Sequence, residues 1–256
     1  MRKLITLKVS CSVKIQIDFL KTFLFSFSLA VPLCAVGTPA GAETLRASIY
    51  AVGKTSEAPL FIQESERVRE GKFTNWSSVI KDPAGTVIMT EKMTIEDGVV
   101  KYHYVEQQQI NEAYELESNR NTVAFKTYSL KDGKKSEVTD TAERDKPSEF
   151  IMGPTAESYL RAHIPQLNDK KTLKVDFGIH EISRYIGFKF VNVKTESNIM
   201  LIKMKPSNFI IAALVDPIMI SFDLTKDRIV KIIGRTPLCE RKNGKWKPID
   251  AEIIYH

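Results

Sequence analysis

Turn signals recur between residues 82 and 244 and separate runs of residues that favour β-strands. Most combine Asp or Asn with a following Gly, and such residues tolerate the positive φ angles of tight hairpins. They are Asp82-Pro83-Ala84-Gly85, Asp97-Gly98, Asp132-Gly133 and Asn243-Gly244. The runs between them are rich in Val, Ile, Thr, Tyr and Phe, which pack well on a pleated surface. The pattern predicts a mainly β fold in which hairpins join consecutive strands.

The expected strands are long. They cover residues 86–95, 99–105, 172–177, 185–193, 199–205, 218–224, 228–234 and 246–255. Most of them have 7–10 residues, a length better suited to a strongly twisted sheet than to a sandwich. We therefore predict a long-stranded, strongly curved antiparallel sheet or open barrel with two short helices.

The first helix is predicted over 153–163, with Pro154 at an early helical position and its end ahead of Pro165. His163 falls on the same helical face as Leu160, which favours packing at a helix edge over metal binding. The second helix is predicted over 207–215, capped by Ser207, although a buried strand is an alternative for so short a run.

This second segment is apolar on every side from Phe209 onward. Seven consecutive apolar residues are too few to span a bilayer, and we expect the fold, a ligand or a partner to cover them. Ile211 and Leu214 are expected in the core. Phe209, Ile210 and Leu214 are also candidate ligand-binding residues, although Leu214 cannot serve both roles fully.

One domain is expected over residues 43–256. The polar segment 134–149 is the best linker candidate, so a subdivision near 134–150 is the alternative. A single sheet is preferred because neither part clearly encloses a core alone. In the run 60–69, one face carries Glu64 and Glu66 and the other carries Arg67 and Arg69, so neither face suits a lipid environment.

The amino-terminal region has the three parts of a secretory signal peptide. Scattered basic residues precede the apolar run 23–31, and the small-residue triplet Ala40-Gly41-Ala42 follows. We predict cleavage after Ala42 and a periplasmic mature protein with no stable transmembrane span. Retention as a membrane anchor is the alternative.

Charge and cysteine content narrow the function classes. Of the net charge of +6, residues 1–42 carry +4, so the other 214 residues carry only +2 and show no basic excess for nucleic acid. Removal of residues 1–42 leaves Cys239 alone, beside Glu240 and with no histidine near it in sequence, which favours a buried apolar role.

Motifs for catalysis and cofactor binding are missing. The sequence His180-Glu181-Ile182-Ser183-Arg184 starts like a zinc-binding H-E-x-x-H, but Arg184 stands at the second histidine position. No metal, cofactor or catalytic residue is predicted. If a site is assembled only in three dimensions, its candidates are His180, Glu181 and Arg184; otherwise the segment is a polar turn between strands.

Two tyrosines of one strand face, Tyr102 and Tyr104, are further candidates for a ligand pocket. Aromatic pairs across strands also stabilise sheets without any ligand, and that interpretation is favoured.

The carboxy-terminal half resembles a family of uncharacterised proteobacterial periplasmic proteins. The resemblance covers about residues 150–256 and rests on the segments 183–190, 207–209, 216–223 and 253–255 with Gly234. It departs from the family after Gly234, where Arg235-Thr236-Pro237 replaces the usual sequence. The resemblance implies no activity. The expected curved sheet is also similar in architecture to the lipoprotein-carrier fold.

These observations favour an exported, periplasmic protein that binds an apolar ligand or a hydrophobic or lipidated segment of a partner, because a half-open sheet offers a concave apolar cavity. The expected partners are a lipid or an envelope protein. The first alternative is an envelope structural or interaction module without a small ligand. The second is an enzyme with a dispersed site.

Overall fold

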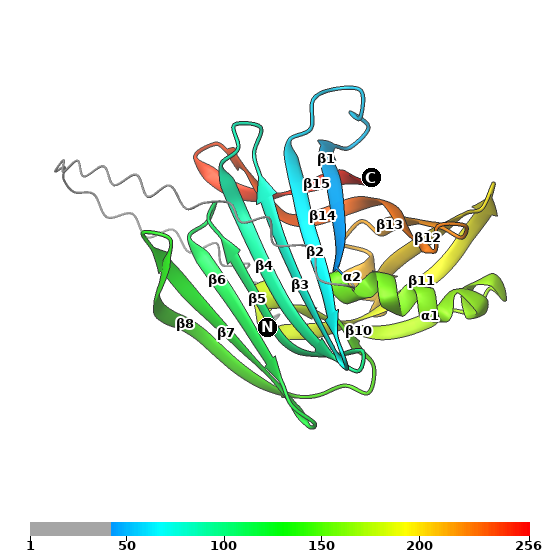
Figure 1. The fold of residues 1–256 in the computed structure, drawn as a ribbon, viewed down its shortest axis with the longest axis horizontal. Coiled ribbons are helices and arrows are strands. Elements are labelled where there is room, and N and C mark those ends of the chain that lie inside the picture. The colour runs from blue at the N-terminus through cyan, green and yellow to red at the C-terminus, as the bar shows by residue number, and fades with distance from the viewer. Residues whose placement is uncertain (1–41) are drawn as a thin grey trace, which may run out of the picture. The chain divides into compact units, whose positions relative to one another are not determined.

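The computed structural model describes residues 42–256, which form one mainly β unit (Figure 1). The predicted signal peptide, apart from its last residue, lies outside the described residues. The prediction of a long-stranded, curved antiparallel sheet with two short helices is confirmed, and the sheet is not closed.

All fifteen strands of the described chain belong to one sheet, in the order β8-β7-β6-β5-β4-β3-β2-β1-β15-β14-β13-β12-β11-β10-β9. The strands are β1 Ala42–Ala51, β2 Phe61–Glu70, β3 Phe73–Lys81, β4 Val87–Glu96, β5 Val99–Gln107, β6 Glu112–Ser118, β7 Thr122–Lys131, β8 Lys134–Asp145, β9 Phe150–Ile151, β10 Leu173–Ile179, β11 Arg184–Glu196, β12 Ile199–Pro206, β13 Ile218–Asp223, β14 Arg228–Lys242 and β15 Lys245–Tyr255.

The first strand joins the two halves of this sheet. β1 pairs with β2 on one side and with the last strand, β15, on the other, so that β1–β8 form a first half and β9–β15 a second half. Neighbours are antiparallel except β9 and β10. The predicted linker 134–149 contains the edge strand β8, so this part of the chain extends the sheet rather than dividing it.

One face of the sheet, here called the inner face, carries the core. In β12 the alternate residues Met200, Ile202 and Met204 point to this face and are buried, as the period-two pattern of a strand requires. On the second half this core packs under the helix α1, Ala156–Asn168. On the first half it packs against Met152 and Phe150, which belong to the chain just before α1.

Helix α1 follows a single 3₁₀ turn, η1, at Gly153–Thr155, and lies across the second half of the sheet (Figure 1). The prediction that this helix ends ahead of Pro165 is wrong. Pro165 removes one backbone hydrogen bond, but the helix continues to Asn168 because Leu167 is fully buried in the same core as Leu160 and holds the last turn in place.

Helix α2 is a single turn, Phe209–Ala212, in the connection between β12 and β13. Asn208, rather than the predicted Ser207, caps it by accepting hydrogen bonds from the backbone N–H groups of residues 210 and 211. The expectation that Ile211 and Leu214 lie in the core is wrong: Leu214 is 75% exposed and Ile211 is only partly buried, while Phe209 is 80% exposed.

Within residues 42–256, the helices are all too short or too polar to cross a membrane.

Candidate functional site

A small apolar cavity lies on the inner face, between the second half of the sheet and the start of α1. Its volume is 160 Å³. Its walls come mainly from β10 and β12–β15, with apolar side chains that include Phe177, Met204, Ile218, Ile220, Ile232 and Tyr255. We call it the inner cavity. Its polar lining is confined to the side formed by β2 and the first turn of α1, where Gln63, Ser65, Arg67 and Glu157 stand.

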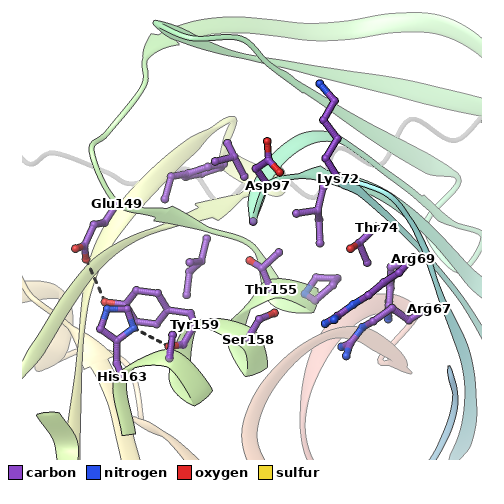
Figure 2. Close-up of a pocket in the computed structure, with 18 of the residues that line it drawn as sticks. Arg67, Arg69, Lys72, Thr74, Asp97, Glu149, Thr155, Ser158, Tyr159 and His163 are labelled. Carbon is purple, nitrogen blue, oxygen red and sulfur yellow. Dashed lines mark hydrogen bonds between the residues drawn. The ribbon is translucent and has the colours of Figure 1, made fainter. Parts of the chain in front are cut away.

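A larger cavity of 650 Å³ lies next to it, between the hairpins of the first half and one side of α1. We call it the outer cavity; Figure 2 shows it from close range. Its lining is more polar and includes the basic residues Arg67, Arg69, Lys72 and Lys146. Arg67, Trp76 and Pro154 line both cavities, so the two spaces adjoin at these three residues.

Arg67 is the charged residue at this junction, and it is only 9% exposed. Its guanidinium group donates a hydrogen bond to Glu43 Oε2 at 3.1 Å and lies 3.7 Å from Glu157 Oε1. Glu157 is itself fixed, because its Oε2 accepts a hydrogen bond from the backbone N–H of Ile229 and its Oε1 one from Arg161. The position of Arg67 is therefore held by carboxylates from β1 and α1.

Arg69 stands two residues further along β2, on the same face as Arg67, and its side chain is exposed. Among residues 42–256 its guanidinium group has no carboxylate partner. Figure 2 shows the two arginine side chains next to one another, directed toward Thr155 at the end of η1 and Ser158 in the first turn of α1.

The other charged groups of the outer cavity are mostly engaged with neighbours. Lys72 forms an ion pair with Glu96, which raises the pKa of the Lys72 ammonium group. Lys146 donates a hydrogen bond to the backbone oxygen of Asn119, and burial, together with Lys101, lowers its pKa. The Lys146 ammonium group therefore gives up its proton more readily than an exposed lysine.

The far wall carries an aromatic pair on α1. The Tyr159 hydroxyl donates to Glu149 Oε2 at 3.1 Å, and the His163 ring contacts the Tyr159 ring with centroids 4.3 Å apart (Figure 2). Burial, and then Glu149, raise the pKa of the Tyr159 hydroxyl, which keeps it a neutral hydrogen-bond donor. His163 also bonds the backbone oxygen of Tyr159 through Nδ1 at 2.7 Å, so it packs along its own helix as predicted.

The structure places the five predicted ligand-binding residues away from both cavities. Tyr102 and Tyr104 lie on β5 with their rings stacked, on the face opposite to the buried His103. On that face Tyr104 bonds Glu106 and contacts the Lys135 ammonium group. The other three residues, Phe209, Ile210 and Leu214, lie at α2 and are exposed. A ligand-binding role for these five residues stays a prediction.

The segment that begins with His180 is a polar turn, η2 at His180–Ile182, and it does bring distant residues together. His180 is buried and its Nε2 lies 2.9 Å from His103 Nδ1, while His103 Nε2 lies 2.6 Å from Glu91 Oε1. Glu181, within this turn, and Arg184, the first residue of β11, are the other two candidates from this motif, and both are exposed. In the hydrogen bond between the His180 and His103 rings, one ring nitrogen donates and the other accepts.

This buried row of Glu91, His103 and His180 is enclosed by rings. Tyr114 and Phe125 lie 5.7 Å and 6.2 Å from the His180 ring, measured between centroids. None of the three residues lines either of the two cavities. In the described chain, no group of three or more His, Cys, Asp or Glu side chains is arranged to hold a metal ion. The row is thus a structural contact between the halves of the sheet.

Reasoning from the sequence placed Arg67 and Arg69 on one strand face but did not identify them as site residues. The signal was present: Gln63, Ser65, Arg67 and Arg69 make one face of a strand polar where the neighbouring strands bury apolar residues on theirs. A polar row on the buried side of a sheet commonly marks a binding site or a cavity that contains water.

A comparison of the chain with protein-family models, curated proteins and solved structures finds no match. The resemblance of residues 150–256 to a periplasmic family stays a prediction, and the function is argued from the described residues.

Proposed function

We propose that the protein is an exported, periplasmic binding protein that holds an apolar chain in the inner cavity. The observation that carries the proposal is the cavity itself, an apolar space on the inner face that the protein's own side chains leave unfilled. Protein interiors are close-packed and contain few voids larger than a water molecule. A lasting apolar space of this kind is the usual form of a small-ligand site.

The volume indicates how much of a ligand the inner cavity accepts. A cavity of about 150 Å³ lined by aliphatic and aromatic side chains is large enough for a benzene ring. The inner cavity, at 160 Å³, therefore takes a short part of an apolar chain, and the rest of the ligand would occupy the adjoining outer cavity of 650 Å³. A lipid chain and a lipidated or hydrophobic segment of a partner both meet this description.

The proposal can be tested with a neutral fluorescent probe, N-phenyl-1-naphthylamine, whose emission rises in apolar surroundings. Ala156, the buried first residue of α1, lines the inner cavity. Ala156→Leu places three more carbon atoms there, so we expect the probe to bind the native protein and to lose about tenfold or more in affinity for this variant.

The matched control is Ala213→Leu, because Ala213 is exposed just after α2 and lines neither cavity. Thermal unfolding shows that both variants are folded. Equal binding by Ala156→Leu and the native protein, or no binding at all, would contradict the proposal.

The export part of the proposal is tested separately. Amino-terminal sequencing of the protein recovered from the cell envelope is expected to begin at Glu43. A chain that begins at Met1 would remove the periplasmic assignment and leave the cavity argument unchanged.

A further inference from the structure

We propose that the outer cavity binds the anionic head group of the same ligand, a carboxylate or phosphate, through Arg69 and Arg67. The ligand is then a single-chain amphiphile, with the end of its tail in the inner cavity and the rest of its chain and its head in the outer cavity, at the two arginines. This inference rests on the proposed function and names the class of ligand.

The first support is the position of the two arginines on β2. Both point to the inner face, where Arg67 stands opposite Trp76 and Arg69 opposite Thr74 of β3. Arg67 is buried and paired with carboxylates, as a buried charge requires. Arg69 is exposed, lines the outer cavity and has no carboxylate partner within residues 42–256.

The second support is the balance of charge around the cavity. Its lining has four Lys or Arg residues and only two carboxylates, Asp97 and Glu149. Glu149 accepts a hydrogen bond from Tyr159 on the far wall, and Figure 2 shows Asp97 near Lys72 rather than near the arginines. Arg67 and Lys72 are already paired with Glu43, Glu157 and Glu96, which leaves Arg69 as the arginine of this lining whose charge a ligand's carboxylate or phosphate can balance.

The third support is the order of the groups along the path from the inner to the outer cavity. Apolar walls come first, then Trp76 and Arg67 at the junction, and then Arg69 with the hydroxyl-bearing Ser158. An amphiphile whose tail end fills the inner cavity passes the junction with the rest of its chain and places its head in the outer cavity, which Arg69 lines. The arginine fork matches the oxygen atoms of a carboxylate or phosphate in pairs, which a lysine cannot do.

The arginines also differ in what they can contribute. Arg67 is held by Glu43 at 3.1 Å and by Glu157 at 3.7 Å, so it is positioned before a ligand arrives, but part of its charge is already balanced. Arg69 keeps its full charge and its hydrogen-bond donors. Arg69 is thus expected to determine the preference for an anionic head, with Arg67 orienting the ligand.

The test compares ligands that share one tail. Dodecanoate, dodecyl phosphate, dodecanol and dodecyltrimethylammonium, each below its micelle concentration, are titrated calorimetrically into the mature protein at neutral pH. We expect the two anions to bind about tenfold or more tightly than dodecanol, and the cation to bind more weakly than dodecanol. The two anions together show whether a carboxylate or a phosphate is preferred.

The variant Arg69→Gln is expected to lose this preference, so that dodecanoate binds about as weakly as dodecanol while dodecanol itself is unaffected. Arg241→Gln is the matched control, because it removes the same charge from a residue that is exposed on β14 and lines neither cavity. An equal loss in this control would overturn the inference by showing a non-specific effect of net charge.

The outcomes separate this inference from the proposed function. If dodecanol and dodecanoate bind the native protein equally well, the head-group inference is overturned and the apolar-binding function stands. If none of the four ligands binds, the proposed function is overturned and the inference with it.

Discussion

Two of the contacts between the halves of the sheet differ in packing: one is filled, and the other leaves space. At the first, the turn η2 inserts His180 against His103 of β5, and rings close around the pair. At the second, Arg67 of β2 approaches Glu157 of α1, and cavities of 160 Å³ and 650 Å³ remain around it. Both contacts use charged or titratable groups, so the difference between them lies in packing.

In the filled contact the polar groups serve one another. Glu91, His103 and His180 form a continuous row of hydrogen bonds within a closed part of the core. In the hollow contact the ion pairs of Arg67 border the two cavities, and the neighbouring Arg69 has no carboxylate partner among the described residues. This difference supports a structural role for the first contact and the proposed ligand binding for the second.

The largest effect is expected from breaking the filled contact. His103→Leu leaves the Glu91 carboxylate and the His180 ring buried without their partner, which should lower the free energy of unfolding by about 3 kcal/mol. Urea denaturation measures it. His163→Leu, on the partly exposed helix α1, is the control and should cost less than about 1 kcal/mol. Equal losses in the two variants would mean that the first contact is not tightly packed.

A smaller effect is expected from acid. Burial, and then the neighbouring His103, hold the pKa of His180 well below its usual value. As the pH falls below about 6.5, the unfolded chain takes up a proton at His180 that the folded chain refuses, so stability is lost by at most about 1.4 kcal/mol per pH unit.

The stabilising contribution of a neutral His180 is therefore fully present above about pH 6.5 and decreases below it. The comparison of native protein with His180→Gln isolates this group. Denaturation measured from about pH 7 down to about pH 5 should show the native protein losing more stability than the variant. If the native protein and His180→Gln lose the same stability over this pH range, the assignment of the pH dependence to His180 is contradicted.

In the hollow contact, the corresponding change is expected to cost less. Arg67→Met removes the cation between Glu43 and Glu157 but keeps the apolar stem, and water in the adjoining cavities can solvate the carboxylates that remain. We expect a loss of about 1 kcal/mol in urea denaturation, with Arg69→Met near zero as the control. A loss as large as that of His103→Leu would show that this contact is as closely packed as the first.

Much of the fold follows from local patterns. The alternation in 199–205 predicts a strand that the structure shows as Ile199–Pro206, and the turn at Asp97-Gly98 joins β4 to β5 as expected. Strand β8 is harder to predict, since it lies at an edge and nearly all its side chains are exposed, so no apolar alternation marks it. The end of α1 depends on a long-range contact of Leu167, which outweighs the local effect of Pro165.

The candidate site follows less well from the sequence because it depends on contacts between distant residues. Alternation places Arg67 and Arg69 on the same face of β2, but it does not show that α1, about 90 residues later, lies opposite them. His103 and His180 are likewise 77 residues apart. Strand periodicity defines the faces of a sheet, whereas a cavity depends on which elements cover those faces.

The smallest effect is expected at α2, where sequence and structure disagree most. An all-apolar run predicts a covered segment, and a carboxylate introduced into a core costs several kcal/mol because it loses its hydration. In the structure, Phe209 and Leu214 are 80% and 75% exposed, so Phe209→Asp and Leu214→Asp leave the new carboxylate in water. We expect the free energy of unfolding to change by less than about 0.5 kcal/mol in each variant. Ile220→Asp, at a 2% exposed position lining the inner cavity, is the positive control and should unfold the protein or destabilise it severely. If Leu214→Asp instead destabilises the isolated protein as Ile220→Asp does, the apolar residues at α2 are covered in solution. The comparison of a filled and a hollow contact would then have to include the surface that covers them.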